Sequence, residues 1–180
     1  PVRRHSLIAP IRDIEIARGV NWAARIEGQL QHYRRRAPYF DDVLSLVHEC
    51  LPPEETSLLR LNLRGLAGVC GRLGIRFDGR LLSEMNLRLG PIDAPGDWSL
   101  RVAGALGLDE CLNPPGGRHL YAPEKFAASG VRLTIQEPLD FHYDCAGYGF
   151  QPALSILDVL MWSPPARVRA WLDARQRARR

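Results

Sequence analysis

Apolar residues recur every three or four positions through the first part of the chain, which is the spacing of one helix face. Trp22, Ile26, Leu30 and Tyr33 share such a face, and a leucine-rich stretch repeats the pattern further on. Asparagine and serine or threonine stand where helix caps are expected. The pattern predicts helices over residues 22–36, capped by Asn21, over 39–51, and over 58–73, capped by Thr56 or Ser57.

Beyond residue 74 the alternation typical of strands enters the chain. Val131, Leu133 and Ile135 alternate with polar neighbours and form the clearest predicted strand. Shorter stretches of the same kind predict strands over residues 75–77, 81–82 and 110–112, and one such stretch, over residues 14–16, precedes the first helix. Two helices are predicted among them, over 98–106, with Asp97 as cap and Gly107 as its end, and over 123–130.

A buried helix is predicted near the C-terminus. Pro152 leads into Ser155, and Asp158 follows three residues later, which is an acidic version of the capping box. An almost unbroken apolar run comes next. A last helix is predicted after the proline pair at 164–165.

The order of these elements predicts the fold class. Alternating helices and strands in the second half favour an α/β fold with a small mixed or parallel sheet, helices around it, and a helical cluster in the first half. Neither an internal repeat nor a low-complexity linker interrupts the 180 residues. We therefore expect one domain over residues 1–180.

Composition and charge narrow the class of protein. The chain is 46% hydrophobic and 24% charged, as in ordinary globular proteins, and its net charge is +4. Arginines gather at residues 34–36 and 167–180, runs that are typically solvated faces, so nucleic acid is not the expected partner. With neither a membrane-length apolar run nor a signal-peptide pattern, the expected place of action is the cytoplasm.

Cysteines and histidines give little sign of a metal. The four cysteines are scattered without a Cys-x-x-Cys pair, which favours buried reduced thiols. His142, Asp144 and Cys145 lie close together, but in one loop and without a second pair of ligands. We predict no metal site, and the sequence indicates no particular cofactor.

Several segments resemble the WbqC-like family, bacterial proteins often encoded among genes for O-antigen and other surface polysaccharides. They occur in the family's order over most of the chain. The matching pieces are Asn21-Trp22, Tyr33 with residues 37–40, Asn62, residues 82–84, Leu106-Gly107, Asn113, Gly116-Gly117, Tyr121, Phe126 with Gly130-Val131, and residues 152–160. The family's opening strand and its Gln-Pro segment are not found, so we expect the chain to be N-terminally truncated relative to the family.

The resemblance implies a transferase that acts on sugar or amino-sugar intermediates, by acyl or aminoacyl transfer, with a small anionic or nucleotide-linked substrate. A second hypothesis is a non-catalytic module that binds anions or nucleic acid through its arginine-rich helices. A third is self-association through the sheet edge that a missing strand would leave open.

Two segments suggest substrate binding. The first is the loop from Asn113 to Arg118, where the backbone of Gly116 and Gly117 could approach a phosphate that Arg118 clamps. In the other interpretation this loop is only a Pro-Gly turn whose glycines need a positive φ. The second is Asn21, Trp22 and Arg25, where a ring could stack on a base or sugar while the arginine pairs with an anion. In the other interpretation Asn21 only caps, Trp22 is core and Arg25 is solvated.

Other residues complete the predicted site. Asp158 and His142 are the catalytic candidates, with Ser155 at the helix mouth as a substrate contact or only a cap. The remaining substrate-binding candidates are Ser83, Glu84 and Tyr121, each of which could equally be a turn or packing residue. If the protein is an enzyme, one cleft should gather Asn21, Arg25, Asn113, Arg118 and Asp158.

Overall fold

The computed structural model describes residues 1–178; the last two arginines of the predicted basic tail lie outside the described residues. The chain forms two compact units. The first combines residues 1–79 with the C-terminal part from Phe141 onward, and the second covers Arg80–Asp140. The organisation as one domain over residues 1–180 stays a prediction.

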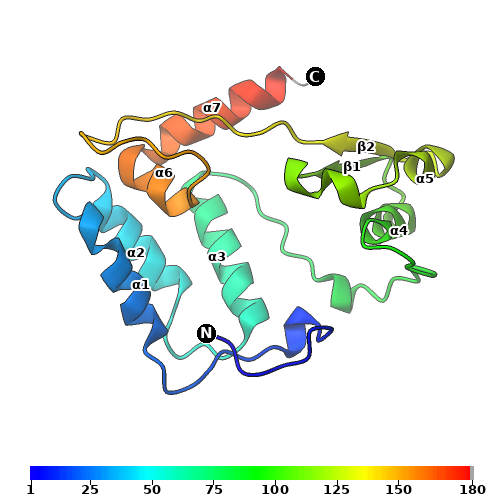
Figure 1. The fold of residues 1–180 in the computed structure, drawn as a ribbon, viewed down its shortest axis with the longest axis horizontal. Coiled ribbons are helices and arrows are strands. Elements are labelled where there is room, and N and C mark those ends of the chain that lie inside the picture. The colour runs from blue at the N-terminus through cyan, green and yellow to red at the C-terminus, as the bar shows by residue number, and fades with distance from the viewer. Residues whose placement is uncertain (179–180) are drawn as a thin grey trace. The chain divides into compact units, whose positions relative to one another are not determined.

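The first unit is helical. Its helices are α1 (Trp22–Leu30), α2 (Phe40–Cys50), α3 (Leu58–Arg72), α6 (Ile156–Trp162) and α7 (Pro165–Arg177). In Figure 1, α1 and α2 run side by side as a helical hairpin, with α3 beside α2. The core of this unit joins α2 to α6 through buried side chains that include Phe40, Leu46, Leu160 and Met161.

The helix caps expected in this unit are confirmed at three places. The Asn21 side chain accepts a hydrogen bond from the Ala24 N–H, the Ser57 hydroxyl accepts one from Arg60 N–H, and the Ser155 hydroxyl accepts one from Leu157 N–H. The first helix is shorter than predicted, because α1 ends at Leu30 and a 3₁₀ helix, Gln31–Tyr33, follows.

The second unit holds the sheet. Strands β1 (Glu110–Asn113) and β2 (Arg132–Ile135) pair in parallel, with Cys111 opposite Leu133. Helices α4 (Asp97–Leu106) and α5 (Pro123–Ala128) supply its core with Leu100, Ala103 and Phe126. Helices combined with a small parallel sheet confirm the predicted α/β class, and Gly107, at φ 66°, ends α4 as expected.

Three predicted strands are wrong. Glu15 and Ile16 make only isolated antiparallel bridges, to Ser57 and Val2. Residues 75–77 form no ladder, and Leu82 begins a short 3₁₀ helix, Leu82–Glu84. Apolar runs of two or three residues resemble strands, but a strand needs a neighbour with free backbone groups, and sequence alone does not show whether one is present.

The sequence suggested that Asp97 caps α4 from outside the helix, but the structure shows otherwise. Asp97 is the first residue of α4, with Gly96 in the cap position. Its carboxylate accepts the N–H groups of Asp93 and Ala94 and forms a 2.8 Å ion pair with Lys125. The ammonium of Lys125, more than any other group, holds the pKa of Asp97 below its ordinary value.

Candidate functional site

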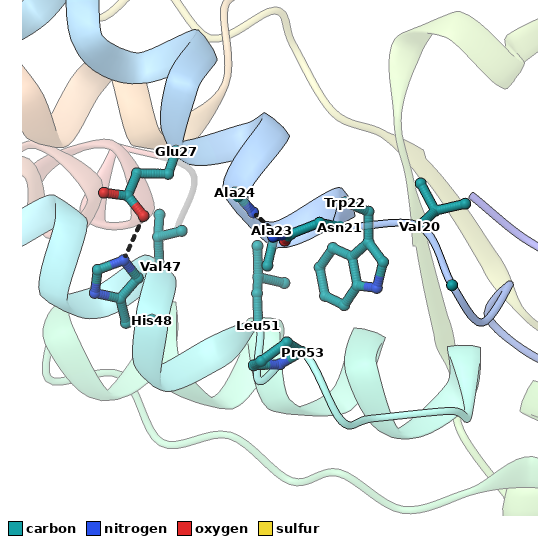
Figure 2. Close-up of a pocket in the computed structure, with 11 residues that line it drawn as sticks. Val20, Asn21, Trp22, Ala23, Ala24, Glu27, Val47, His48, Leu51 and Pro53 are labelled. Atoms are coloured by element: carbon teal, nitrogen blue, oxygen red, sulfur yellow. Dashed lines mark hydrogen bonds and ion pairs between the residues drawn. The ribbon is translucent and has the colours of Figure 1, made fainter.

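A pocket of about 670 Å³ opens between the start of α1 and the end of α2. Figure 2 shows the ring of Trp22 close to Leu51 and Pro53 at one end of this pocket, and Glu27 and His48 at the other. Val20, Asn21, Ala23, Ala24 and Val47 complete most of the wall. One end is therefore apolar, and the other carries two groups that can take up or release protons.

Glu27 and His48 are hydrogen-bonded across the helical hairpin. The distance from Nε2 of His48 to Oε2 of Glu27 is 3.2 Å. Glu27 projects from α1 and His48 from α2, and each side chain keeps about half of its surface open to solvent (42% and 57%). Because a carboxylate can only accept, we assign the shared hydrogen to Nε2 of His48. The imidazole then carries its lone pair on Nδ1, so the pair can act as an oriented general base.

A second pocket, of about 470 Å³, continues along the same two helices. It shares Ala24 and Glu27 with the first, so the two pockets adjoin along the hairpin, and together we call them the hairpin groove. Its far end is polar: Gln31 and Arg34 come from the end of α1 and the turn after it, and Asp41 from the first turn of α2. Phe40 and Leu44 supply apolar surface.

Two of the predicted site residues line the hairpin groove. Asn21 caps α1 at its rim, and Trp22 forms part of its apolar wall while keeping only 6% of its surface exposed. Arg25 is exposed and lies outside the lining of either pocket. The structure therefore brings Asn21 and Trp22 together, but it does not add Arg25 to them.

Asp158 lies in a polar cluster inside the first unit. It is buried, and it accepts hydrogen bonds from the hydroxyls of Tyr33, at 2.5 Å, and of Tyr143. The predicted capping box is thus half right, because Ser155 caps the helix while the Asp158 carboxylate binds two tyrosines. His142 is exposed, with its ring centroid 4.6 Å from that of Phe150.

The second unit holds the other predicted residues. Asn113, at the end of β1, is buried and accepts a 2.7 Å hydrogen bond from Tyr121, while its Nδ2 makes none within residues 1–178. The remaining members of the predicted set lie on short 3₁₀ helices: Gly116, Gly117 and Arg118 on Pro115–Leu120, and Ser83 and Glu84 on Leu82–Glu84.

The glycine pair does not form the turn that was one of its two interpretations. Neither Gly116 nor Gly117 has a positive φ. A Cβ at Gly117 would stand 3.5 Å from the Tyr121 ring, an ordinary van der Waals contact, so the packing against Tyr121 does not require a glycine there. Because the predicted common cleft would draw on residues of both units, it stays a prediction, as do the roles assigned to its members.

Comparison with known proteins gives the family. The model of the WbqC-like protein family matches residues 1–170. The chain belongs to this family. No curated protein and no solved structure matched the sequence significantly. Family membership therefore rests on the sequence pattern itself, and the site of this WbqC-like protein has to be argued from its own geometry.

Neither a metal cluster nor a membrane helix is found in the part of the WbqC-like chain that the structure describes. Three or more His, Cys, Asp or Glu side chains nowhere gather there as metal ligands would. Each described helix is too short or too polar to cross a membrane.

The thiols of Cys50, Cys111 and Cys145 have their pKa values raised, mainly by burial, which keeps them protonated.

The residues that line the hairpin groove were mostly missed from the sequence. Glu27 lies on α1 and Arg34, seven residues later, directly follows the 3₁₀ helix Gln31–Tyr33, while Asp41 and His48 are seven residues apart on α2. When two segments run antiparallel, equal spacing along each of them brings the residues together in pairs. Here Glu27 faces His48 at one end, and Arg34 and Asp41 line the same pocket at the other. That spacing was the available signal.

Stability at high pH should depend on the tyrosines bound to Asp158. Burial, and then the Asp158 carboxylate, raise the pKa of Tyr33 and Tyr143 above their ordinary value of about 10. Since the unfolded chain ionises first, the stabilisation is complete below pH 10 and is lost as the pH rises above it. Urea unfolding at pH 8 and pH 11 should show this loss. The Tyr33→Phe, Tyr143→Phe double variant should lose less stability than the wild type between these two pH values. An equal loss in the wild type and the double variant would contradict the assignment.

Proposed function

We propose that this WbqC-like protein is a transferase that acts on a sugar or amino-sugar intermediate of bacterial surface-polysaccharide biosynthesis, in the cytoplasm, with the hairpin groove as its active site. The observation that carries the proposal is the hydrogen-bonded His48–Glu27 pair on the wall of a pocket whose other end is apolar. Family membership supplies the link to surface polysaccharides.

The geometry suits a transfer that needs a general base. Nδ1 of His48 takes the proton from an acceptor hydroxyl or amine as the acceptor oxygen or nitrogen forms a bond to the donor carbon. The bond from that carbon to its leaving group breaks, and the leaving group departs with the electron pair. Glu27 holds the imidazole through Nε2–H and stabilises the imidazolium that forms, which then returns its proton to the leaving group.

The apolar end suits the body of a sugar. Small-molecule sites are largely apolar, with a few polar groups that fix orientation. Trp22, Leu51 and Pro53 provide such a wall, and Asn21 provides an amide at its rim. Because Glu27 and His48 are half exposed, a bound substrate would also exclude water from them and so strengthen their interaction.

A nucleic-acid-binding role is less well supported, because several arginines of the basic runs are held by the protein itself. Arg36 donates to the Ala146 carbonyl and lies over the Tyr148 ring, and Arg167 donates to the His142 carbonyl. Arg169 forms both an ion pair with Asp173 and a hydrogen bond to the Gly74 carbonyl. These side chains are less available for phosphates than free surface arginines.

Deleting the gene in its source bacterium tests the proposal. We expect the surface polysaccharide to lose one substituent or residue of its repeating unit, visible as a fixed mass difference by mass spectrometry, while a sugar intermediate accumulates. A plasmid-borne wild-type copy should restore both. An unchanged repeating unit in the deletion strain would contradict the proposed function.

A further inference from the structure

The polar end of the hairpin groove carries two opposite charges. Arg34 and Asp41 both line the pocket of about 470 Å³. Among the described residues, neither comes within 4.0 Å of an opposite charge, and so they do not form an ion pair with each other. Both are exposed. The pocket thus offers a cation and an anion at the same time.

Two such charges select for a ligand that carries both signs. A guanidinium binds phosphate or carboxylate through charge-assisted hydrogen bonds, and a carboxylate accepts them from an ammonium group. A ligand with only one charge leaves the other protein charge unmatched and partly desolvated, which weakens binding. The pocket therefore favours a ligand with an ammonium group and an acidic group in one small molecule.

The remaining lining suits a sugar ring between these charges. Gln31 donates its side-chain amide to the Glu27 carbonyl, which leaves the amide oxygen for a ligand hydroxyl. Phe40 and Leu44 offer apolar surface, and Glu27 is shared with the pocket that contains His48. A sugar held here would extend from Arg34 and Asp41 toward the general base.

We propose that the end of the hairpin groove lined by Arg34 and Asp41 binds an amino-sugar phosphate, with Arg34 taking the phosphate and Asp41 the ammonium group. The choice of a sugar as the carrier of the two charges rests on the proposed function. The pairing of charges rests on the pocket itself. Arg34 and Asp41 are binding residues in this assignment, and the proton transfer stays with His48.

Calorimetry on the full chain with three ligands tests the charge pairing. Glucosamine 1-phosphate carries both charges, glucose 1-phosphate lacks the amine, and glucosamine lacks the phosphate. Each lost charge-assisted contact should weaken binding about tenfold or more. Equal affinities for the three ligands, or no measurable binding of glucosamine 1-phosphate, would overturn the proposal.

Paired variants locate the two contacts. Arg34→Gln should lower the affinity for glucosamine 1-phosphate and glucose 1-phosphate about tenfold and leave the affinity for glucosamine unchanged. Asp41→Asn should lower only the affinities for glucosamine 1-phosphate and glucosamine, the two ligands that carry an amine. Arg35→Gln and Asp42→Asn are matched controls, since these neighbours are exposed and lie outside the groove lining. Equal effects of the variants and their controls would count against the assignment.

The outcome separates this proposal from the proposed function. His48→Asn should bind glucosamine 1-phosphate like the wild type, because His48 does not line this pocket. Selective binding together with an unchanged polysaccharide in the deletion strain would overturn the transferase role alone. An altered polysaccharide without selective binding would overturn the charge-pair subsite alone.

Discussion

Replacing His48 by asparagine is expected to slow the transfer reaction by roughly 10²–10⁴-fold, the usual contribution of a general base. Asparagine keeps a polar side chain of similar length but cannot accept a proton at neutral pH. The fold should be unaffected, because His48 is exposed and its only side-chain hydrogen bond in the described structure is to Glu27. The measurement is the rate at which purified protein consumes the sugar intermediate that the deletion strain accumulates.

Two comparisons make this result specific. His119→Asn removes an exposed histidine of the second unit and should leave the rate unchanged. Glu27→Gln keeps an acceptor for the Nε2–H but removes the negative charge that would stabilise the imidazolium, so it should lower the rate. If His48→Asn retains more than a tenth of the wild-type rate, His48 is not the general base.

Replacing Asp158 by alanine is expected to lower the free energy of unfolding by about 3–5 kcal/mol. The change leaves the hydroxyls of Tyr33 and Tyr143 without their acceptor, and a buried unpaired hydroxyl costs about 1–3 kcal/mol. For a chain of this size the Tm should fall by about 10 °C. Chemical and thermal unfolding, followed by circular dichroism, measure both quantities.

A matched series separates this cluster from a general effect of removing a carboxylate. Glu54→Ala removes an exposed carboxylate and should change stability little. Tyr143→Phe removes one of the two hydroxyls and should cost less than Asp158→Ala. Adding Tyr143→Phe to Asp158→Ala should recover part of the loss, because one unpaired hydroxyl is then gone. No recovery in the double variant would show that the tyrosine contact does not account for the loss.

The two predictions concern different parts of the first unit: the Asp158 cluster is expected to stabilise the fold, and the hairpin groove to carry the reaction. Asp158 was predicted from the sequence as a catalytic residue, and that role stays a prediction. Its carboxylate links three chain segments, because Tyr33 follows α1, Tyr143 lies in the loop before α6, and Asp158 lies in α6. The geometry supports a stabilising role for this cluster and places a solvent-accessible acid–base pair in the hairpin groove.

Local features of the fold were predictable because they depend on neighbouring residues. Asn21, Ser57 and Ser155 cap helices as expected, since the backbone groups they bind lie two or three residues away. The strand over residues 132–135 follows from alternation along one short segment. The family could also be identified from the order of its motifs, and the family model matches residues 1–170.

By itself, then, the sequence determined where most helices lie, the caps at Asn21, Ser57 and Ser155, the segments of the two paired strands, the α/β class and the family, because each depends on spacing along the chain. It did not determine the start of α4, where Gly96 and not Asp97 stands in the cap position. Tertiary structure alone decided which polar side chains meet. It joined Asp158 to Tyr33, which is 125 residues away, and it placed His48 against Glu27. A side chain can serve as a cap, a buried acceptor or a catalytic base, and which of these it becomes depends on the partners that packing brings within hydrogen-bonding distance.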